Sequence, residues 1–131
     1  MGLIYLDSCL LIYAVEQHPV WAATVRAAMA AEPQGRFAIS PLVTMECLVK
    51  PLKDGHLALQ QRYQTALGLL MPLALGEQVF LQAAQLRAHF GLKTPDALHL
   101  ACAQHHGCSA LWTNDDRLAQ AAHGLAKNVL R

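Results

Sequence analysis

The sequence predicts an α/β protein, a three-layer α/β/α sandwich around a short central parallel sheet. Four short, continuous apolar runs are typical of strands buried on both faces. Longer segments with helical apolar spacing separate these runs, and such alternation favours parallel pairing. The chain has 131 residues, of which 54% are apolar and 15% charged, and a chain of this length buries about two thirds of its unfolded surface. We therefore expect residues 1–131 to form a single domain.

The first half of the chain is expected to contain two strands and four helices. The runs LIYL and RFAIS predict strands over 3–6 and 36–40. A break is expected between Glu32 and Gly35, where Pro33 and Gln34 interrupt the helical pattern. The predicted helices cover 8–16, 18–31, 41–50 and 56–70.

The second half is expected to continue the alternation. Strands are predicted at 71–75 and 109–113, with a possible edge strand at 127–130, and helices at 77–90, 95–106 and 115–123. The segment TPDALHLACA begins the helix at 95–106. There Thr94 is expected as the N-cap, Pro95 as the first helical residue and Gly107 as the stop.

Composition narrows the classes of protein that this chain can belong to. No apolar run approaches the roughly 20 residues of a membrane span, and the N-terminus carries neither a basic region nor a cleavage pattern. The four cysteines form no CxxC pair, which is typical of buried thiols in a reducing cytoplasm. The net charge of +1 is too small to attract nucleic acid to the protein as a whole, although a basic rim around an acidic centre stays possible. We expect a cytoplasmic protein without a membrane partner.

The chain has only nine acidic residues, so their positions are informative. Asp7 directly follows the first predicted strand, and Asp115 follows the fourth after one intervening residue. Ligands of open α/β sheets gather beyond the carboxyl ends of the strands, which is where both acids are expected. The alternative is that each acid only caps the helix that follows it, as Asp often does.

Glu46 falls inside the apolar arc of its predicted helix. Taken with 100° per residue, this arc contains Leu42, Val43, Met45, Leu48 and Val49. A carboxylate that points toward the protein is unfavourable unless something compensates its charge. The alternative is an ion pair with Lys50, one turn further along the helix.

A cluster of such carboxylates predicts a bound cation. Two carboxylates 5 Å apart repel each other by about 3 kcal/mol at an effective dielectric of 20. They remain ionised only beside a cation and otherwise take up protons. Oxygen ligands select a hard ion, Mg²⁺ or Mn²⁺, which can activate water against a phosphodiester. This chemistry is the hydrolytic cleavage of nucleic acid.

In order along the chain, the segments YLDSCLLIYAVE, SPLVTMECLV, KTPDALHLACA and LWTNDDRL resemble the motifs of PIN domains, most closely those of VapC-type toxins. The resemblance covers essentially the whole chain. It implies a metal-dependent endoribonuclease that acts on RNA, forms a homodimer and is held inactive by a small antitoxin. The implied metal-binding and catalytic residues are Asp7, Glu46, Asp96 and Asp115. The place of Asp96 beside the other acids comes from this resemblance alone, because a capping role would also explain an acid in the first turn of its helix.

Four further residues are expected around the implied centre. Ser8 and Thr113 occupy hydroxyl positions often seen beside the site, where they would orient ligands or water. Asp116 is expected mainly as the N-terminal acid of the last helix. His99, one turn after Asp96, is expected as a hydrogen-bonded residue that borders the site.

Other functions fit the sequence less well. Zinc ligation by His99, Cys102, His105 and Cys108 is disfavoured because residues three apart on a helix drift 60° per step. A phospho-acceptor domain needs an acid at the end of a central strand and a later lysine, and RFAIS ends without an acid. A non-catalytic interaction module with the same fold remains the main alternative to a nuclease, although a scaffold has no need of clustered acids.

Overall fold

A computed structural model describes residues 2–32 and 35–130 of the chain. Within these residues, five parallel strands form one sheet in the order β3-β2-β1-β4-β5. The strands are β1 (Leu3–Leu6), β2 (Arg36–Ile39), β3 (Met71–Pro72), β4 (Ala110–Thr113) and β5 (Ala126–Asn128). The predicted parallel sheet is confirmed.

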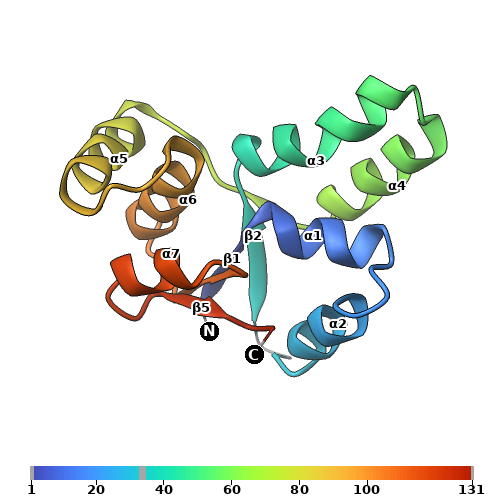
Figure 1. Ribbon diagram of the computed structural model, residues 1–131, viewed down its shortest axis with the longest axis horizontal. Coiled ribbons are helices and arrows are strands. Elements are labelled where there is room, and N and C mark those ends of the chain that lie inside the picture. Colours follow the sequence, from blue (N-terminus) through green and yellow to red (C-terminus); the bar gives the residue numbers. More distant parts are fainter. Residues whose placement is uncertain (1, 33–34, 131) are drawn as a thin grey trace.

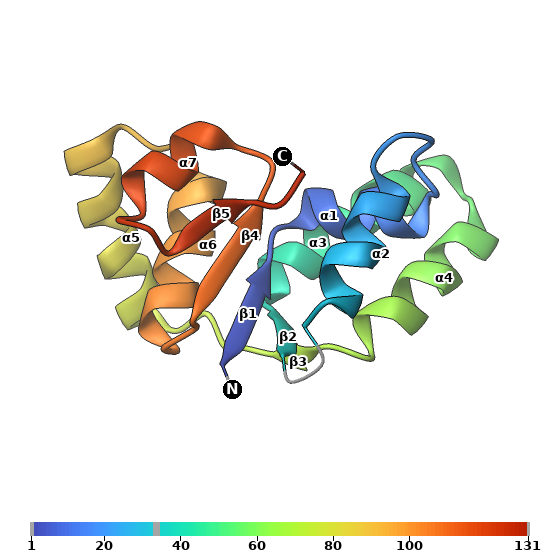
Figure 2. The ribbon, with the colours of Figure 1, turned by 90° about the horizontal axis from the view of Figure 1, so that it is seen from below.

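Helices cover both faces of the sheet (Figures 1 and 2). One layer contains α1 (Ser8–Val15), α2 (Ala22–Ala30), α3 (Pro41–Asp54) and α4 (Leu57–Leu67). The other contains α5 (Glu77–Phe90), α6 (Thr94–His105) and α7 (Asp116–Ala121). This is the predicted three-layer sandwich. None of the helices in the described residues has the length and apolar character that crossing a bilayer requires.

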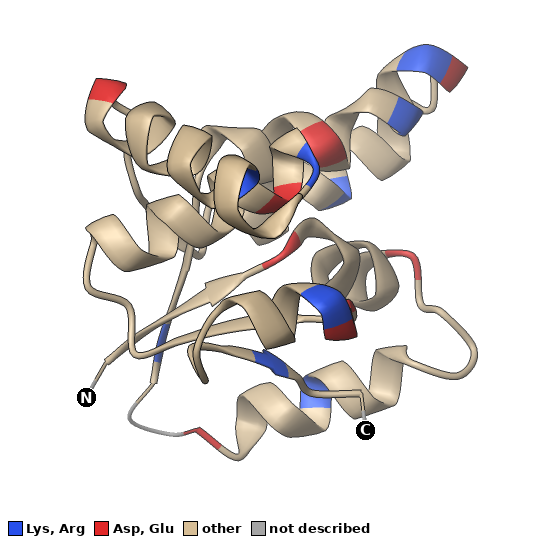
Figure 3. Ribbon diagram, turned by 60° about the vertical axis from the view of Figure 1, so that its left-hand side comes forward, with Lys and Arg blue, Asp and Glu red and all other residues tan. Residues whose placement is uncertain are grey.

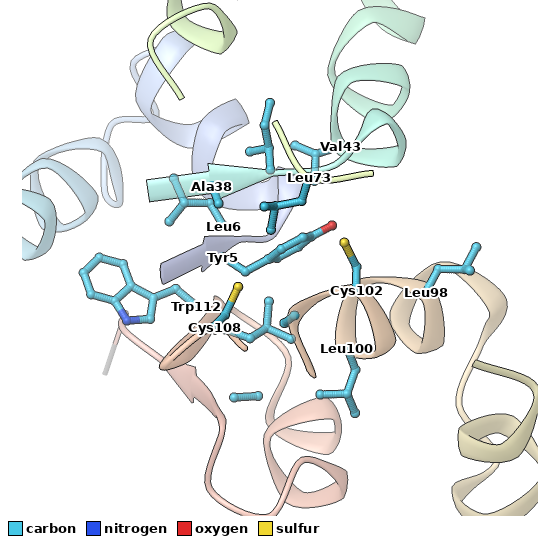
Figure 4. Packing of buried hydrophobic residues seen from close by; sticks show 14 of the residues in the cluster. Tyr5, Leu6, Ala38, Val43, Leu73, Leu98, Leu100, Cys102, Cys108 and Trp112 are labelled. Atoms are coloured by element: carbon cyan, nitrogen blue, oxygen red, sulfur yellow. The ribbon is translucent and has the colours of Figure 1, made fainter. Parts of the chain in front are cut away.

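The core lies between the sheet and these two layers (Figure 4). Tyr5 and Leu6 of β1 and Leu111 of β4 have no exposed surface, because neighbouring strands flank them and helices cover both faces. α6 is buried continuously from Ala97 to Ala103. Such burial is the main favourable contribution to folding. It also means that any polar group on α6 needs a partner within the protein.

The order of the strands places a functional edge next to β1. From β1 the chain moves outward to β2 and β3, then returns to β4 on the other side. Ligands of open α/β sheets bind at such a switch point, beyond the carboxyl ends of the strands. The backbone N–H of Asp7 donates to the carbonyl of Trp112 at 3.0 Å, so the residues after β1 and β4 leave the sheet side by side.

Several predicted helices differ in length from the observed ones. α4 covers 57–67 instead of 56–70, and α7 covers 116–121 instead of 115–123. α3 continues through Pro51, which is buried, to Asp54 instead of stopping at residue 50. Pro51 has no backbone N–H, so α3 lacks one of its helical hydrogen bonds. The helix nevertheless continues to Asp54 and ends at Gly55, which adopts the left-handed conformation. α2 begins at Ala22 rather than at residue 18, because the Nδ1 atom of His18 accepts the N–H groups of Val20 and Trp21 and forms a turn.

Smaller differences concern the ends of elements. The N-cap of α6 is Lys93, not the expected Thr94, and it provides no side-chain cap. β3 is two residues long instead of five because the chain leaves the sheet edge after Leu73 N donates to Ile39 O. β5 forms, but over 126–128. The expected break at Pro33–Gln34 lies outside the described residues.

Candidate metal centre

Asp7 lies at the carboxyl end of β1, where the sheet places it against β4. It is the N-cap residue of α1, but its side chain makes no capping hydrogen bond. Its Oδ2 atom instead accepts the hydroxyl of Thr113, the last residue of β4, at 2.8 Å. Both residues are buried. The capping alternative for the Asp7 side chain is therefore wrong, and Thr113 holds this carboxylate in place.

Glu46 points inward from α3 and contacts His99 of α6. Its Oε1 atom lies 2.8 Å from His99 Nε2. The alternative ion pair with Lys50 does not form, because the Lys50 ammonium binds Glu16 at 2.8 Å. The apolar arc used to predict this orientation was partly wrong, since Met45 and Val49 are more than half exposed.

The charge state of Glu46 reflects two opposing effects. Partial burial alone would raise the pKa of Glu46, but the hydrogen bond and charge of His99 outweigh it, with a smaller contribution from the Ser8 hydroxyl. The net result is a pKa below the usual value of a glutamate. The Ser8 hydroxyl thus lies near the Glu46 carboxylate, and its expected role in orienting ligands or water stays a prediction.

His99 is the central residue of a buried hydrogen-bond chain. Its Nδ1 atom lies 2.6 Å from Tyr5 Oη, which in turn lies 2.7 Å from Ser40 Oγ. All three side chains are at least 98% buried, and in Figure 4 the Tyr5 hydroxyl points between Cys102 and the segment around Leu73. Because Nε2 faces the carboxylates, it carries the proton. Nδ1 and the hydroxyls of Tyr5 and Ser40 form the rest of the hydrogen-bond chain, away from the carboxylates.

Asp96 and Asp115 complete the acidic group at a somewhat greater distance. Asp96 occupies the first turn of α6, and burial together with the charges of Asp7 and Asp115 raises its pKa, with a smaller effect of Glu46. Both side chains line one cavity next to the sheet edge. The fold therefore brings Asp96 close enough to the other acids for their charges to oppose its ionisation.

Asp115 also serves its own helix, as the alternative explanation anticipated. Its Oδ1 atom accepts the N–H groups of Arg117 and Leu118 at 2.9 and 3.4 Å, and its own N–H donates to Thr113 Oγ1 at 3.1 Å. Asp116 is the first residue of α7, as expected, and accepts Asn128 Nδ2 at 3.1 Å. The capping role fixes the Asp115 side chain at the rim of the cavity.

The tightest group of possible ligands in the described residues is Asp7, Glu46 and His99, whose ligand atoms lie within 4.8 Å of one another. His99 Nε2 is hydrogen-bonded to Glu46, so the two carboxylates are the members of this group that are free to bind a cation. The disfavoured zinc set of histidines and cysteines forms no comparable group in the same part of the chain. All four cysteines are free thiols, and Cys47, Cys102 and Cys108 are buried. Most of the ribbon in Figure 3 carries neither acidic nor basic residues.

Sequence reasoning missed Tyr5 and Ser40 and gave His99 only a border position. The available signals were a tyrosine inside a fully buried strand and a histidine in an otherwise apolar helix. Each polar atom requires a partner when it is buried. Nothing in the spacing, however, indicated that these residues, 35 and 94 positions apart, serve one another.

The fold and the site together define a class: an α/β domain with carboxylates gathered at the switch point of a parallel sheet. The family model of the PIN domain matches residues 4–124. The chain therefore belongs to the PIN domain family, which confirms the resemblance seen in its motifs.

Solved structures of toxin–antitoxin proteins have the same fold. A toxin–antitoxin complex from Klebsiella pneumoniae matches with a TM-score of 0.80 and 25% identity, over 96% of this chain and 97% of that one. VapBC2 from Rickettsia felis, bound to a promoter DNA fragment, matches with a TM-score of 0.82 and 17% identity, over 96% of this chain and 98% of that one. VapC20 from Mycobacterium tuberculosis, a sarcin–ricin loop cleaving toxin, matches with a TM-score of 0.74 and 16% identity, over 90% of this chain and 94% of that one. No curated protein sequence matches the chain.

Proposed function

We propose that this protein is a metal-dependent endoribonuclease, the toxin of a type II toxin–antitoxin pair. The observation that carries the proposal is the convergence of Asp7, Glu46, Asp96 and Asp115 from four separate elements onto one edge of the sheet. Within a PIN domain, such a convergence is unfavourable for folding and needs a functional reason. The VapC and VapBC neighbours support the toxin assignment.

The donor set fits the proposed ion. The carboxylate oxygens of Asp7, Asp96 and Asp115 are hard ligands of the kind that Mg²⁺ and Mn²⁺ prefer. The raised pKa of Asp96 is an expected sign of a carboxylate group that lacks sufficient positive charge nearby. Such an ion would supply an activated water and neutralise the negative charge that develops on the phosphodiester.

The chain's own residues hold the carboxylates in fixed orientations. The Thr113 hydroxyl donates a hydrogen bond to one oxygen of Asp7, and His99 is hydrogen-bonded to one oxygen of Glu46. The first N–H groups of α7 donate to one oxygen of Asp115. Each of these bonds reduces the freedom of a side chain before a ligand arrives, which lowers the entropic cost of binding. Glu46 would complete the ligand shell of such an ion or position the attacking water.

Two protein partners belong to the proposal. A small cognate antitoxin is supported by the neighbours that were solved as toxin–antitoxin complexes, and a homodimer is expected from the family. The exposed apolar side chains of Met45, Val49 and Leu52 on α3 offer a surface that either partner could cover.

Cleavage of RNA by the purified protein tests the proposal. We expect cleavage of a structured RNA with Mg²⁺ or Mn²⁺, none with EDTA, and a loss of at least 100-fold in Asp96→Asn. Asp54→Asn, an exposed acid at the end of α3, is the matched control and should retain full activity. Cleavage that survives both EDTA and Asp96→Asn would refute the assignment. Antitoxin binding without any cleavage would favour the non-catalytic module instead.

A further inference from the structure

Beside the acidic group lies a cavity of about 330 Å³ between the end of α5, the start of α6 and α7. We infer that this cavity binds one unpaired nucleotide of an RNA strand, adjacent to the phosphodiester that the acidic group acts on. The inference rests on the proposed function, which it extends to the form of the substrate. Its lining includes Phe90, Lys93, Asp96, Asp115, Arg117 and Gln120.

The charges around the cavity suit a phosphate that passes along its wall. Asp96 and Asp115 form the side that belongs to the acidic group, and Lys93 and Arg117 provide cations on the same cavity. Lys93 directly precedes α6, and the backbone of Arg117 is bonded to the Asp115 carboxylate. Carboxylates alone would repel a polyanion, whereas two cations beside them attract its phosphates. This pairing favours a nucleic-acid strand over an uncharged ligand.

The apolar part of the cavity suits a nucleobase. Phe90 is 46% exposed although it is a large aromatic side chain, and its ring makes an edge contact with His123 at a centroid distance of 5.9 Å. Bases stack on such rings, and each stacked base contributes about 1–3 kcal/mol. The Gln120 side chain offers an amide donor and acceptor to a base edge. A base can reach these groups only when it is unpaired.

The wall of the cavity is held in shape by the protein itself. Gly91 adopts a positive φ of 66°, which ends α5 and turns the chain toward α6. Arg87 Nε donates to the carbonyl of Leu92 at 3.0 Å, and Leu92 is buried. A cavity of this volume, formed before ligand binding, is within the range of small-ligand sites.

Binding of a fluorescently labelled single-stranded RNA oligonucleotide, measured by anisotropy in EDTA, tests the inference separately from cleavage. We expect Phe90→Ala to weaken binding by about 5- to 150-fold, the stacking contribution converted at 1.4 kcal/mol per tenfold. Phe80→Ala is the matched control, because Phe80 is 51% exposed on α5, close to the 46% of Phe90, but lies outside the cavity. Arg117→Gln should weaken binding and reduce its salt dependence, whereas Arg62→Gln on α4 should not.

The outcomes separate the two ideas. Equal dissociation constants for Phe90→Ala and Phe80→Ala, or no binding of single-stranded RNA, would overturn the nucleotide site even if the protein cleaves RNA. Weaker binding by Phe90→Ala in a protein that never cleaves RNA would support the site and refute the nuclease. Gln120→Ala, at an exposed position, provides a second variant should Phe90→Ala fail to fold.

Discussion

His99 shows how a single residue can organise a site without being one of its acids. One ring nitrogen faces the carboxylates of Glu46 and Asp7, at 2.8 and 3.7 Å. The other lies against Tyr5, whose hydroxyl is held by Ser40. These bonds orient the ring so that Nε2 faces carboxylates, which accept hydrogen bonds, and an N–H group is the complementary partner there. The His99 side chain therefore provides a partner for the buried Tyr5 hydroxyl and also orients Glu46.

At this scale we predict that Tyr5→Phe destabilises the protein by about 1–3 kcal/mol. The substitution keeps the ring but leaves buried polar atoms of Ser40 and His99 without their partner. Urea denaturation measures the change. Tyr13→Phe removes an exposed hydrogen bond to Asn114 and should change stability by less than about 0.5 kcal/mol. Equal effects of the two substitutions would contradict the importance of the buried chain.

At the scale of elements, the ends of the helices decide where the acids lie. α1 begins directly after Asp7, α6 carries Asp96 in its first turn, and Asp115 caps α7. The stability of α3 depends on how the helix ends, because Pro51 within it lacks a helical N–H. Gly55 ends the helix with a φ of 63°. Glu46 lies in the middle of this helix, so its position depends on the whole element.

For this element we predict that Gly55→Ala destabilises the protein by about 1–2 kcal/mol, because an alanine is strained in the left-handed region. A Cβ at this position would meet no neighbouring atom, so backbone strain is the only expected cause. Gly76→Ala is the control, since its φ is −85° and its Cβ would also be free of contacts. The control should lose less than about 1 kcal/mol, because alanine is a poorer N-cap of α5 than glycine but is not strained at this φ. Chemical denaturation curves that rank the two variants in the opposite order would count against this explanation.

At the scale of the whole molecule, the acidic group opposes folding. Burial and like charges hold the pKa of Asp96 above its ordinary value, so ionised Asp96 is less favourable in the folded protein than in the unfolded chain. The stability associated with protonated Asp96 is complete at acidic pH and is lost as the pH rises through the folded-state pKa. Glu46, whose pKa is lowered, behaves in the opposite way.

We therefore predict that Asp96→Asn raises the melting temperature by a few degrees at pH 7 in EDTA, and that this difference shrinks at an acidic pH, because Asp96 takes up its proton as the pH falls through its raised folded-state pKa. Mn²⁺ should raise the melting temperature of the unaltered protein and have little effect on Asp96→Asn, because a ligand of the folded state stabilises it. Thermal melts at both pH values measure these effects. A variant that is less stable at both pH values, or equally responsive to Mn²⁺, would contradict them.

The amino-acid sequence by itself determined the alternation of buried strands and helices, and with it the sheet edge to which Asp7 and Asp115 belong. These features depend on local patterns of apolar residues and on a general rule for parallel sheets. Glu46 was placed correctly by helical phase, although part of the supporting arc is exposed, and Asp96 was placed by resemblance to a family. Only the tertiary structure decided that His99, Tyr5 and Ser40 bond to one another, that Lys50 pairs with Glu16, and that a cavity adjoins the acids. Such contacts join residues far apart in the chain, and they form because burial leaves a polar group no partner except those that the packing of other elements brings near.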